Sequence, residues 1–419
     1  MTSLVINSCR TVIQRSATRP AQLELAGSGV RVTMSAPVTF KAFAAFADET
    51  VVRDWAYAPR ALQPEDVQIR IVASGVCVRW PPRRVRTSLT PSGALTAVKT
   101  QHSDLSTINQ LYGSETAIRP SVRGHEIVGI VERAGDKAAH QPGDRVAVGT
   151  MQDSCGVCEQ CALGDECYCT QGVFTCSGVH KATGTRCHGG FAERMVVDGR
   201  WAFKVPDALP SIEAAPLMCA GITVFQPLKR HFRANATVGV ASIGGLGHLA
   251  LQFARALGYT KVVAITTTAS KADDARSLGA HDVVVLSDKD ALKAAAKTLD
   301  VLLVTAVYEQ PWTEYARLMR VGGMMCLVGL PAKGKVELPG FLFLMQRLEF
   351  SGSVVGGRAM TAEMLRVAAQ HGVRAVAETL PLSAEGANEA LRRIADNAAR
   401  FRSVLVPAET APAGKQQAL

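Results

Sequence analysis

The sequence predicts a two-domain α/β protein in which a mainly β domain is interrupted by a doubly wound domain with a parallel sheet. Its 419 residues exceed the length that one small core requires. Short β-like runs broken by Gly, Asp and Pro occupy residues 67–76 and 126–148. From about residue 237, strand-like and helix-like runs alternate instead. Such alternation is typical of βαβ units, so the second region is predicted to contain parallel strands.

The individual elements follow from these runs in chain order. In the first region, GHEIVGIVERAG and PGDRVAVG predict strands joined by tight turns. In the second, strands are expected at TVGVA, KVVAI, DVVVL, LDVLLV and GGMMCLVG, with helices at HLALQFARALG and KADDARSLG. Helices over 361–371 and 384–398 then lead to a last strand near 403–406. We interpret this end of the chain as a return to the first domain.

Composition and charge exclude two classes of partner. The chain is 47% hydrophobic and 20% charged, and it has no apolar run near the ~18 residues that a membrane helix needs. Of the net charge of +10, residues 1–36 carry +3 and residues 78–101 carry +5, which leaves +2 for the rest. A near-neutral remainder without interleaved basic and aromatic residues argues against a nucleic-acid partner.

Both ends of the chain differ in composition from the rest. Residues 1–33 are rich in Ser, Thr and Arg and poor in acids, which is typical of a transit peptide. Met34, however, opens MSAPVTFKAF like a natural start, so a misplaced start codon is an equal alternative. The expected location is therefore the cytoplasm, or a plastid or mitochondrion if residues 1–33 are a targeting segment. Residues 408–419 are small and polar, and are expected to be disordered.

Four cysteines carry the strongest local signal. Cys155, Cys158, Cys161 and Cys169 have the spacing C-x2-C-x2-C-x7-C. Thiolates this close suit tetrahedral Zn²⁺, and four of them leave no open position, so the site is predicted to be structural. A disulfide cluster is the alternative, but eleven cysteines in a chain of this length favour a reducing compartment. We interpret the remaining cysteines without a metal role as ordinary thiols: Cys9, Cys167, Cys176, Cys187 and Cys326.

A glycine-rich turn lies between the strand TVGVA and the helix HLALQFARALG. It comprises Ser242, Gly244, Gly245, Leu246 and Gly247, in the place where a dinucleotide fold has G-x-G-x-x-G. Glycines let the turn tighten and let backbone amides approach a pyrophosphate at the start of a helix. Here the first glycine is replaced by Ser242, which can hold the turn only if its φ angle permits.

The residues after the second strand decide which nucleotide is expected. An Asp or Glu there would accept bonds from the ribose 2′-hydroxyl of NAD. This chain has Thr267, Thr268 and Lys271 in that region and no carboxylate between residues 266 and 271. Hydroxyls and an ammonium group suit a 2′-phosphate, so NADP is predicted. The alternative is that Lys271 merely begins an exposed helix.

Together these features resemble the zinc-dependent medium-chain alcohol dehydrogenases, in particular the cinnamyl alcohol dehydrogenase-like branch. The resemblance spans about residues 34–407 and rests on GHEIVG, the four-cysteine segment, GGFAE, APLMCAGITVFQPL, GGLGHLALQFA and GSVVGG. It implies a GroES-like catalytic domain over 34–218, a Rossmann domain over 219–356 and a return to the catalytic domain over 357–407. It also implies two zinc ions per chain and a homodimer.

The resemblance further assigns the residues of a catalytic site. Cys77, His125 and Cys219 match the three ligands of the catalytic zinc, whose open fourth position accepts water or substrate. Glu126 matches the glutamate behind the metal. Ser103 would relay a proton, and Asp104 would orient a ligating imidazole. Arg123 departs from the family, which has proline before GHE.

The greatest departure is a stretch of 24 residues, Val78–Gln101, between Cys77 and HSDLSTI. Family members continue from the first ligand directly into C-H-[ST]-D. A valine codon begins GT and a glutamine codon can end AG, which are the splice-site dinucleotides, so we hypothesise a retained intron. The alternative is a genuine surface loop, because lengthening a loop costs only about 0.6 kcal/mol per doubling.

The predicted activity is hydride transfer between NADP(H) and an alcohol/aldehyde pair, with aromatic, cinnamyl-type or medium aliphatic aldehydes as substrates. The alternative is a non-catalytic paralogue that binds zinc and nucleotide, or a retained-intron product with a split active site. A zinc-ribbon module that binds nucleic acid is disfavoured by the near-neutral remainder of the chain.

Overall fold

The structure is a computed structural model that describes residues 22–24, 31–33, 38–46, 51–77, 120–306, 309–329, 335–396 and 398–410. The chain divides into two compact units, residues 1–39 and 40–419. In the first unit, β1 (Gln22–Glu24) pairs antiparallel with β2 (Arg31–Thr33). The rest of the predicted extension, the stretch 78–101 and residues 411–419 lie outside the described residues. None of the helices that the structure describes is long and apolar enough to span a membrane.

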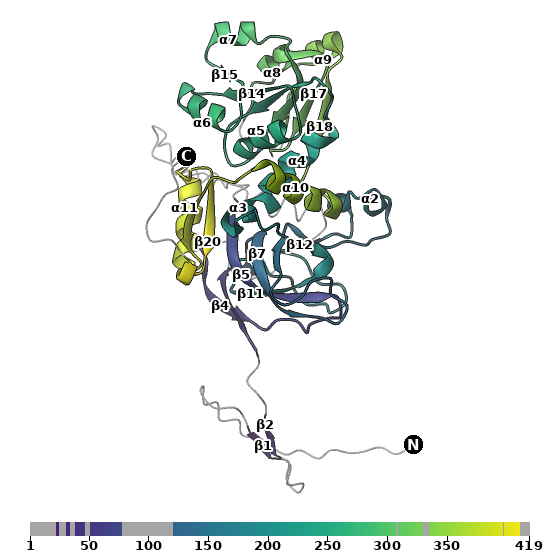
Figure 1. The fold of residues 1–419 in the computed structure, drawn as a ribbon, viewed down its shortest axis with the longest axis vertical. Helices are drawn as coiled ribbons and strands as arrows, with labels where there is room; N and C mark the ends of the chain where they lie inside the picture. Colours follow the sequence, from purple (N-terminus) through teal and green to yellow (C-terminus); the bar gives the residue numbers. More distant parts are fainter. Residues whose placement is uncertain are drawn as a thin grey trace, which may run out of the picture. The chain divides into compact units, whose positions relative to one another are not determined.

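The β region of the second unit is built around one long strand, β5 (Asp66–Val76) (Figure 1). Its seven-stranded sheet has the order β12-β8-β7-β5-β20-β19, and β11 pairs with the first half of β5. The other strands of this sheet are β7 (Glu126–Ala134), β8 (Arg145–Val148), β11 (Arg194–Asp198), β12 (Ala202–Lys204), β19 (Ala377–Pro381) and β20 (Arg402–Val406). Strands β19 and β20 come from the end of the chain, so the predicted return of the chain to this region is observed.

Smaller sheets complete the β region. Strands β4 (Arg53–Tyr57), β3 (Phe40–Ala45) and β6 (Ser121–Val122) form one, and β9 (Met151–Asp153) pairs with β10 (Val173–Phe174).

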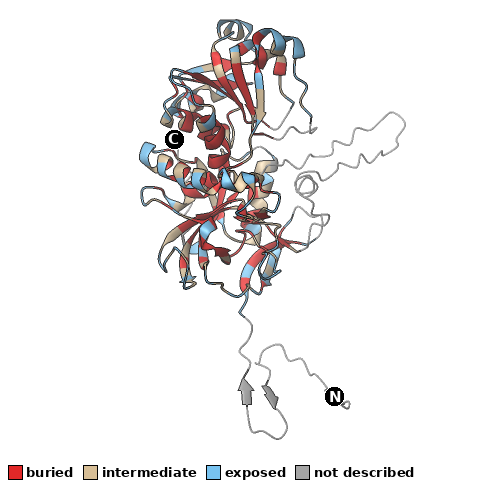
Figure 2. Cartoon of the chain, turned by 90° about the vertical axis from the view of Figure 1, so that its right-hand side faces the viewer, coloured by how far each residue is buried: buried red, intermediate tan, exposed pale blue. Residues whose placement is uncertain are grey.

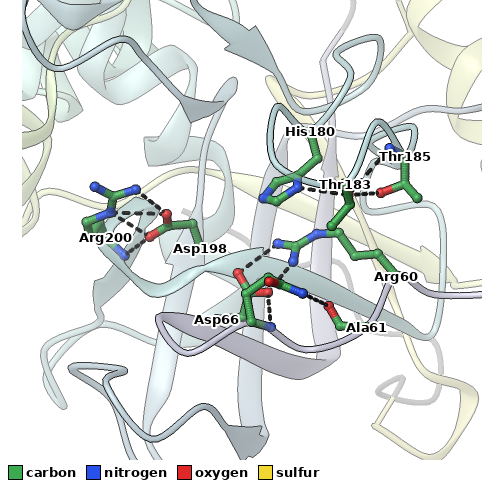
Figure 3. Close-up of polar contacts among 9 residues, drawn as sticks. Arg60, Ala61, Asp66, His180, Thr183, Thr185, Asp198 and Arg200 are labelled. Atoms are coloured by element: carbon green, nitrogen blue, oxygen red, sulfur yellow. Dashed lines mark hydrogen bonds and ion pairs between the residues drawn. The ribbon is translucent and has the colours of Figure 1, made fainter.

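The start of β5 requires charge compensation. Asp66 lies directly opposite Asp198 on the antiparallel strand β11, and like charges in such a pair repel. Each carboxylate has its own arginine (Figure 3): Arg60 binds Asp66 through both amino groups, and Arg200 binds Asp198 at 2.6–3.0 Å. The Arg60 and Asp66 side chains are buried. These pairs fix the end of the sheet where β5 begins, whereas Cys77 follows the other end of the same strand.

The second sheet confirms the predicted doubly wound domain. Its six strands are all parallel and have the order β15-β14-β13-β16-β17-β18. They are β13 (Thr237–Ala241), β14 (Lys261–Thr266), β15 (Asp282–Val285), β16 (Leu299–Val304), β17 (Met319–Leu327) and β18 (Glu349–Gly352). The direction of winding reverses between β13 and β16, and ligands of such sheets bind beyond the carboxyl ends of the strands at that point.

Both faces of this sheet are buried (Figure 2). Alternate residues of β13, β14 and β16 belong to two separate apolar clusters, one of which contains Val240 and Leu303 and the other Ala241 and Leu302. Burial on both faces explains why these strands are continuous apolar runs rather than alternating ones.

The four predicted helices are present, and the described residues contain six further helices that were not predicted. The helices are α2 (Glu159–Ala162), α3 (Ser211–Ala214), α4 (Ala220–Arg230), α5 (Gly247–Ala256), α6 (Ala272–Ser277), α7 (Lys289–Ala294), α8 (Trp312–Leu318), α9 (Gly340–Gln346), α10 (Arg358–His371) and α11 (Ala384–Ala395). Helix α10 begins three residues before the predicted start, directly after Gly357.

Candidate active site

Strand register brings the first two predicted ligands together. Cys77 follows the end of β5, and His125 precedes the start of the antiparallel strand β7. Within that pair Glu126 lies opposite Gly75, where a Cβ atom would approach Glu126 Oε2 to 2.1 Å. A glycine at position 75 is therefore needed for the glutamate to fold back behind the two ligands. Cys219, the residue that directly precedes α4, lies at the same place.

These residues form a donor set that fits zinc. The ligand atoms of Cys77, His125, Glu126 and Cys219 all lie within 4.8 Å of one another. The Cys77 and Cys219 sulfurs are 3.6 Å apart. Two Zn–S bonds of about 2.3 Å at a tetrahedral angle give a sulfur separation of about 3.8 Å. Two thiolates and an imidazole are a typical catalytic zinc set that leaves the fourth position open.

Charge at this cluster is balanced by a buried arginine. Arg402, the first residue of β20, donates to Glu126 Oε1, and both side chains are buried. Burial raises the pKa of Glu126 to about 8, although Arg402 opposes the shift. The hydrogen bond between Cys77 and Cys219 holds the pKa of Cys77 well below its usual range and that of Cys219 well above it. The cluster therefore already stabilises one thiolate.

The four cysteines of the sequence motif form a second group. The sulfurs of Cys155, Cys158, Cys161 and Cys169 lie within 4.8 Å of one another, and those of Cys155 and Cys161 are 3.8 Å apart. The backbone N–H of Cys158 donates to the Cys155 sulfur at 3.3 Å, and backbone hydrogen bonds lower the pKa of that thiol to about 6. The distance between the sulfurs of Cys155 and Cys161 and the lowered pKa of Cys155 both fit tetrahedral zinc. Cys167, which lies between two of these ligands in the sequence, is buried outside the group.

The glycine-rich turn follows β13 at the switch point of the parallel sheet. Ser242 adopts a φ of +74°, a left-handed conformation that is uncommon outside glycine. Its carbonyl accepts from Thr305 Oγ1 at 2.8 Å, and its N–H donates to Ile265 at 2.9 Å. Serine therefore holds the turn because neighbouring strands fix its conformation. Gly247 is needed, since a Cβ atom there would lie 2.0 Å from the Ser242 carbonyl.

The ammonium group of the predicted 2′-phosphate site lies beside this turn. Lys271 Nζ donates to the carbonyl of Ile243 at 3.2 Å, so its charge lies against the turn. Thr268 and Ser270 are exposed and their hydroxyls are 3.2 Å apart. Thr267 is also exposed. Gly244 has open space where a side chain would be, whereas Gly245 packs against Arg402 and Leu246 precedes α5.

Two residues near the site were not predicted from the sequence. Arg402 contacts both Glu126 and Gly245, so it connects the metal cluster to the glycine-rich turn. Cys176, interpreted as an ordinary thiol, binds the His125 side chain and donates to the Gly124 carbonyl at 3.2 Å. No spacing rule marks either residue, because each meets the site only through tertiary contacts. Ser103 and Asp104 lie outside the described residues.

His248 yields a test of stability against pH. It is buried, stacks on Phe401, and bonds Gly244 O through Nδ1 and Val376 N–H through Nε2. Burial lowers its pKa to about 3, and Arg402 adds to that shift. The unfolded chain protonates this histidine below about pH 6.5 while the folded chain does not, so stability falls as pH decreases through that value.

Urea unfolding at pH 7 and pH 5 should show this effect. We expect His248→Phe to be less stable at pH 7 because it loses both bonds. Its loss of stability between pH 7 and pH 5 should be smaller than that of the unaltered protein by about 2 kcal/mol. If both proteins lost the same stability between pH 7 and pH 5, protonation of His248 in the unfolded chain would not be the cause.

Comparisons with known proteins agree with both halves of this architecture. Residues 94–207 match the alcohol dehydrogenase GroES-like domain, and residues 245–370 match the zinc-binding dehydrogenase family. The first match begins inside the stretch 78–101, so Cys77 lies outside it.

Individual relatives are similar over most of the chain. A probable cinnamyl alcohol dehydrogenase of Oryza sativa subsp. japonica is 37% identical over 84% of this chain and 88% of its own length. Cinnamyl alcohol dehydrogenase 7 of Arabidopsis thaliana is 35% identical over 86% and 93%.

Two solved structures share the fold. A cinnamyl alcohol dehydrogenase of Sorghum bicolor has a TM-score of 0.75 and 32% identity, covering 91% of this chain and 100% of its own. A cinnamyl alcohol dehydrogenase of Helicobacter pylori complexed with NADP(H) has a TM-score of 0.73 and 28% identity, covering 89% and 99%.

Proposed function

Because this chain belongs to the zinc-binding medium-chain alcohol dehydrogenases, in their cinnamyl alcohol dehydrogenase-like branch, we propose that it reduces aldehydes to alcohols with NADPH. The coarser activity, that of a zinc-dependent alcohol oxidoreductase, follows from the family itself. The observation that carries the proposal is the two-thiolate, one-imidazole cluster of Cys77, His125 and Cys219 in the same unit as the glycine-rich turn. Aromatic, cinnamyl-type and medium aliphatic aldehydes are the proposed substrates.

Each part of the site has a defined task in this reaction. Bound zinc would polarise the substrate carbonyl, and NADPH would supply the hydride. Cys77, His125 and Cys219 would hold the metal with one position open, and Arg402 would keep Glu126 in place behind it. Backbone amides of Gly244 to Gly247 would face the pyrophosphate. We assign delivery of the proton that completes the alcohol to Ser103, with Asp104 orienting a ligating imidazole.

A direct assay tests this function. Purified protein should contain two zinc ions per chain, one in each cluster, and should oxidise NADPH when cinnamaldehyde is added. Removal of metal by a chelator should stop the reaction, and zinc should restore it. A zinc-free preparation that still reduces the aldehyde would refute the proposal.

The proposed preference for NADPH rests on Lys271 and its neighbours. A 2′-phosphate beside the glycine-rich turn would meet the Lys271 ammonium and the exposed hydroxyls of Thr267 and Thr268. Lys271→Ala should raise the KM for NADPH by about tenfold and leave that for NADH nearly unchanged, because one charge-assisted bond contributes roughly 1.5 kcal/mol. Lys289→Ala, on the exposed first turn of α7, is the matched control. Equal use of both cofactors by the unaltered protein would contradict the assignment.

We also propose that the protein is a homodimer. Among the strands that the structure describes, β18 pairs only with β17 and ends the parallel sheet, so one of its edges is open to pairing. The nearby helix α9 exposes Phe341, Leu344 and Met345. Sedimentation should give twice the mass of one chain, and Leu344→Glu should shift the protein toward the monomer. A monomer at micromolar concentration before any substitution would contradict this proposal.

A further inference from the structure

Side chains of the four-cysteine lobe, residues 155–169, extend out of the lobe and bind a distant part of the chain. The short helix Glu166–Tyr168 directly precedes the fourth cysteine, Cys169. Two of its residues reach residues 354–358, which comprise the end of the β18–α10 connection and the first residue of α10. Asp165, just before it, binds Arg230 and Gln226 of α4. The lobe is therefore attached to two other elements through residues that adjoin its own metal ligands.

The contacts with residues 354–358 are specific. The Tyr168 hydroxyl accepts the Val354 N–H at 3.1 Å. The buried Glu166 carboxylate accepts the backbone N–H and the Nε–H of Arg358, both at 3.0 Å. Between these ties, a Cβ atom on Gly357 would lie 1.9 Å from the Gly164 carbonyl, so backbone touches backbone. The lobe thus holds this connection on both sides of residues 355 and 356.

The residue held between these ties is strained. Val355 has a φ of +34°, which is rare for any residue with a side chain and rarer for a β-branched one. It is 6% exposed, so water does not reach it freely. A strained conformation persists only where the surrounding structure determines it, and such sites often have a functional reason.

Val355 lies near residues that flank one of the catalytic ligands in the sequence. It lines a cavity of about 20 Å³ together with Met218 and Ile222. Met218 directly precedes Cys219, and Ile222 is in the first turn of the helix that follows it. Next to Val355, Gly356 packs against Ile222 so closely that a Cβ atom would lie 2.7 Å from its side chain. A shift of the strained turn would therefore act first on Ile222, which lies three residues after Cys219.

We propose that the cysteine lobe positions the catalytic ligand Cys219, and that Tyr168 and the strained Val355 transmit this effect. Tyr168 and Glu166 act as positioning residues: they hold residues 354–358, and Val355 then acts on Cys219 through Met218 and Ile222. The inference rests on the proposed function, because it assumes a metal in each cluster. It goes further in stating that the two metal sites are coupled, so that changes in the lobe alter the affinity of the catalytic site.

The experiment uses the full chain with cadmium-113 in both sites. Cadmium NMR separates the sites, because a four-sulfur site resonates further downfield than a site with two sulfurs and a nitrogen. Tyr168→Phe removes the hydroxyl that holds Val354 and leaves the ring. Tyr57→Phe is the matched control, since its buried hydroxyl donates to the Arg194 carbonyl at 2.9 Å in the sheet region of the same unit.

The expected result is selective. Tyr168→Phe should shift the resonance of the Cys77–His125–Cys219 site, and a chelator should remove cadmium from that site about fivefold faster, at the low end of typical coupling. The four-sulfur resonance and both signals of the Tyr57→Phe control should stay unchanged. In a Val355→Gly background, where the side chain is absent and glycine tolerates the positive φ, Tyr168→Phe should have little further effect.

The opposing results are distinct. Unchanged resonances and chelation rates in Tyr168→Phe would overturn the coupling and leave the two-metal function intact. A single four-sulfur resonance in the unaltered protein would overturn the proposed function and this inference with it. If Tyr168→Phe does not fold, Glu166→Gln, which weakens the tie to Arg358, provides the same comparison.

Discussion

Cys219→Ser should abolish aldehyde reduction and leave the fold largely intact. Cys219 is one of three ligands that the structure brings together with an open position, and its loss removes the group that polarises the substrate. We expect turnover to fall by at least about a thousandfold, since transition-state charge would lose several kcal/mol of stabilisation. The far-ultraviolet circular dichroism and the four-cysteine zinc should be retained. The measurement is NADPH oxidation together with zinc content per chain.

Two other cysteine variants make this result specific. Cys161→Ser breaks the closed site and should impair folding, because binding of a structural zinc is coupled to folding. Cys326→Ser replaces a buried thiol outside both clusters and should retain both zinc ions and most of the activity. If Cys219→Ser keeps normal turnover, or if Cys161→Ser folds and retains two zinc ions, the assignment of the two sites is wrong.

Deletion of Val78–Gln101 should raise aldehyde reductase activity by about tenfold or more. The deletion joins Cys77 directly to His102 and restores the run GVC-HSDLSTI. Metal ligand and proton relay would then be two residues apart on one short turn, as a precise site requires. A tenfold gain requires the activation free energy to fall by only about 1.4 kcal/mol. The deletion also removes five positive charges that have no acidic residue among them.

The deletion must be compared with the full chain under identical purification, with zinc content and NADPH oxidation measured on both. Genomic sequence across codons 77–102 gives an independent check, because an intron there would carry splice-site dinucleotides. Both forms should contain zinc in both clusters, and the full chain should turn over more slowly because its insert separates Cys77 from Ser103. Equal activity and metal content in both forms would mean that residues 78–101 are a real loop.

The sequence by itself determined the features that depend on neighbours along the chain. Four cysteines within 15 residues must lie close together whatever surrounds them, and their sulfurs indeed gather. Alternating strand and helix patterns predicted a parallel sheet, which the structure contains. The strands of such a sheet are buried on both faces and are therefore continuous apolar runs. The resemblance to a family predicted that Cys77, His125 and Cys219 form one site. Their spacing in the sequence alone does not predict this.

Only the tertiary structure decided the contacts that depend on register between distant strands. Arg402 binds Glu126 across 276 residues because β20 pairs with β5 next to β7. Ser242 tolerates its positive φ because Thr305 and Ile265 hold its backbone. Val355 has a positive φ, and the N–H of the residue before it is bound by Tyr168 of the cysteine lobe. In each case a polar or strained group is stabilised by partners that only folding supplies, and a local sequence pattern carries no information about which partners those are.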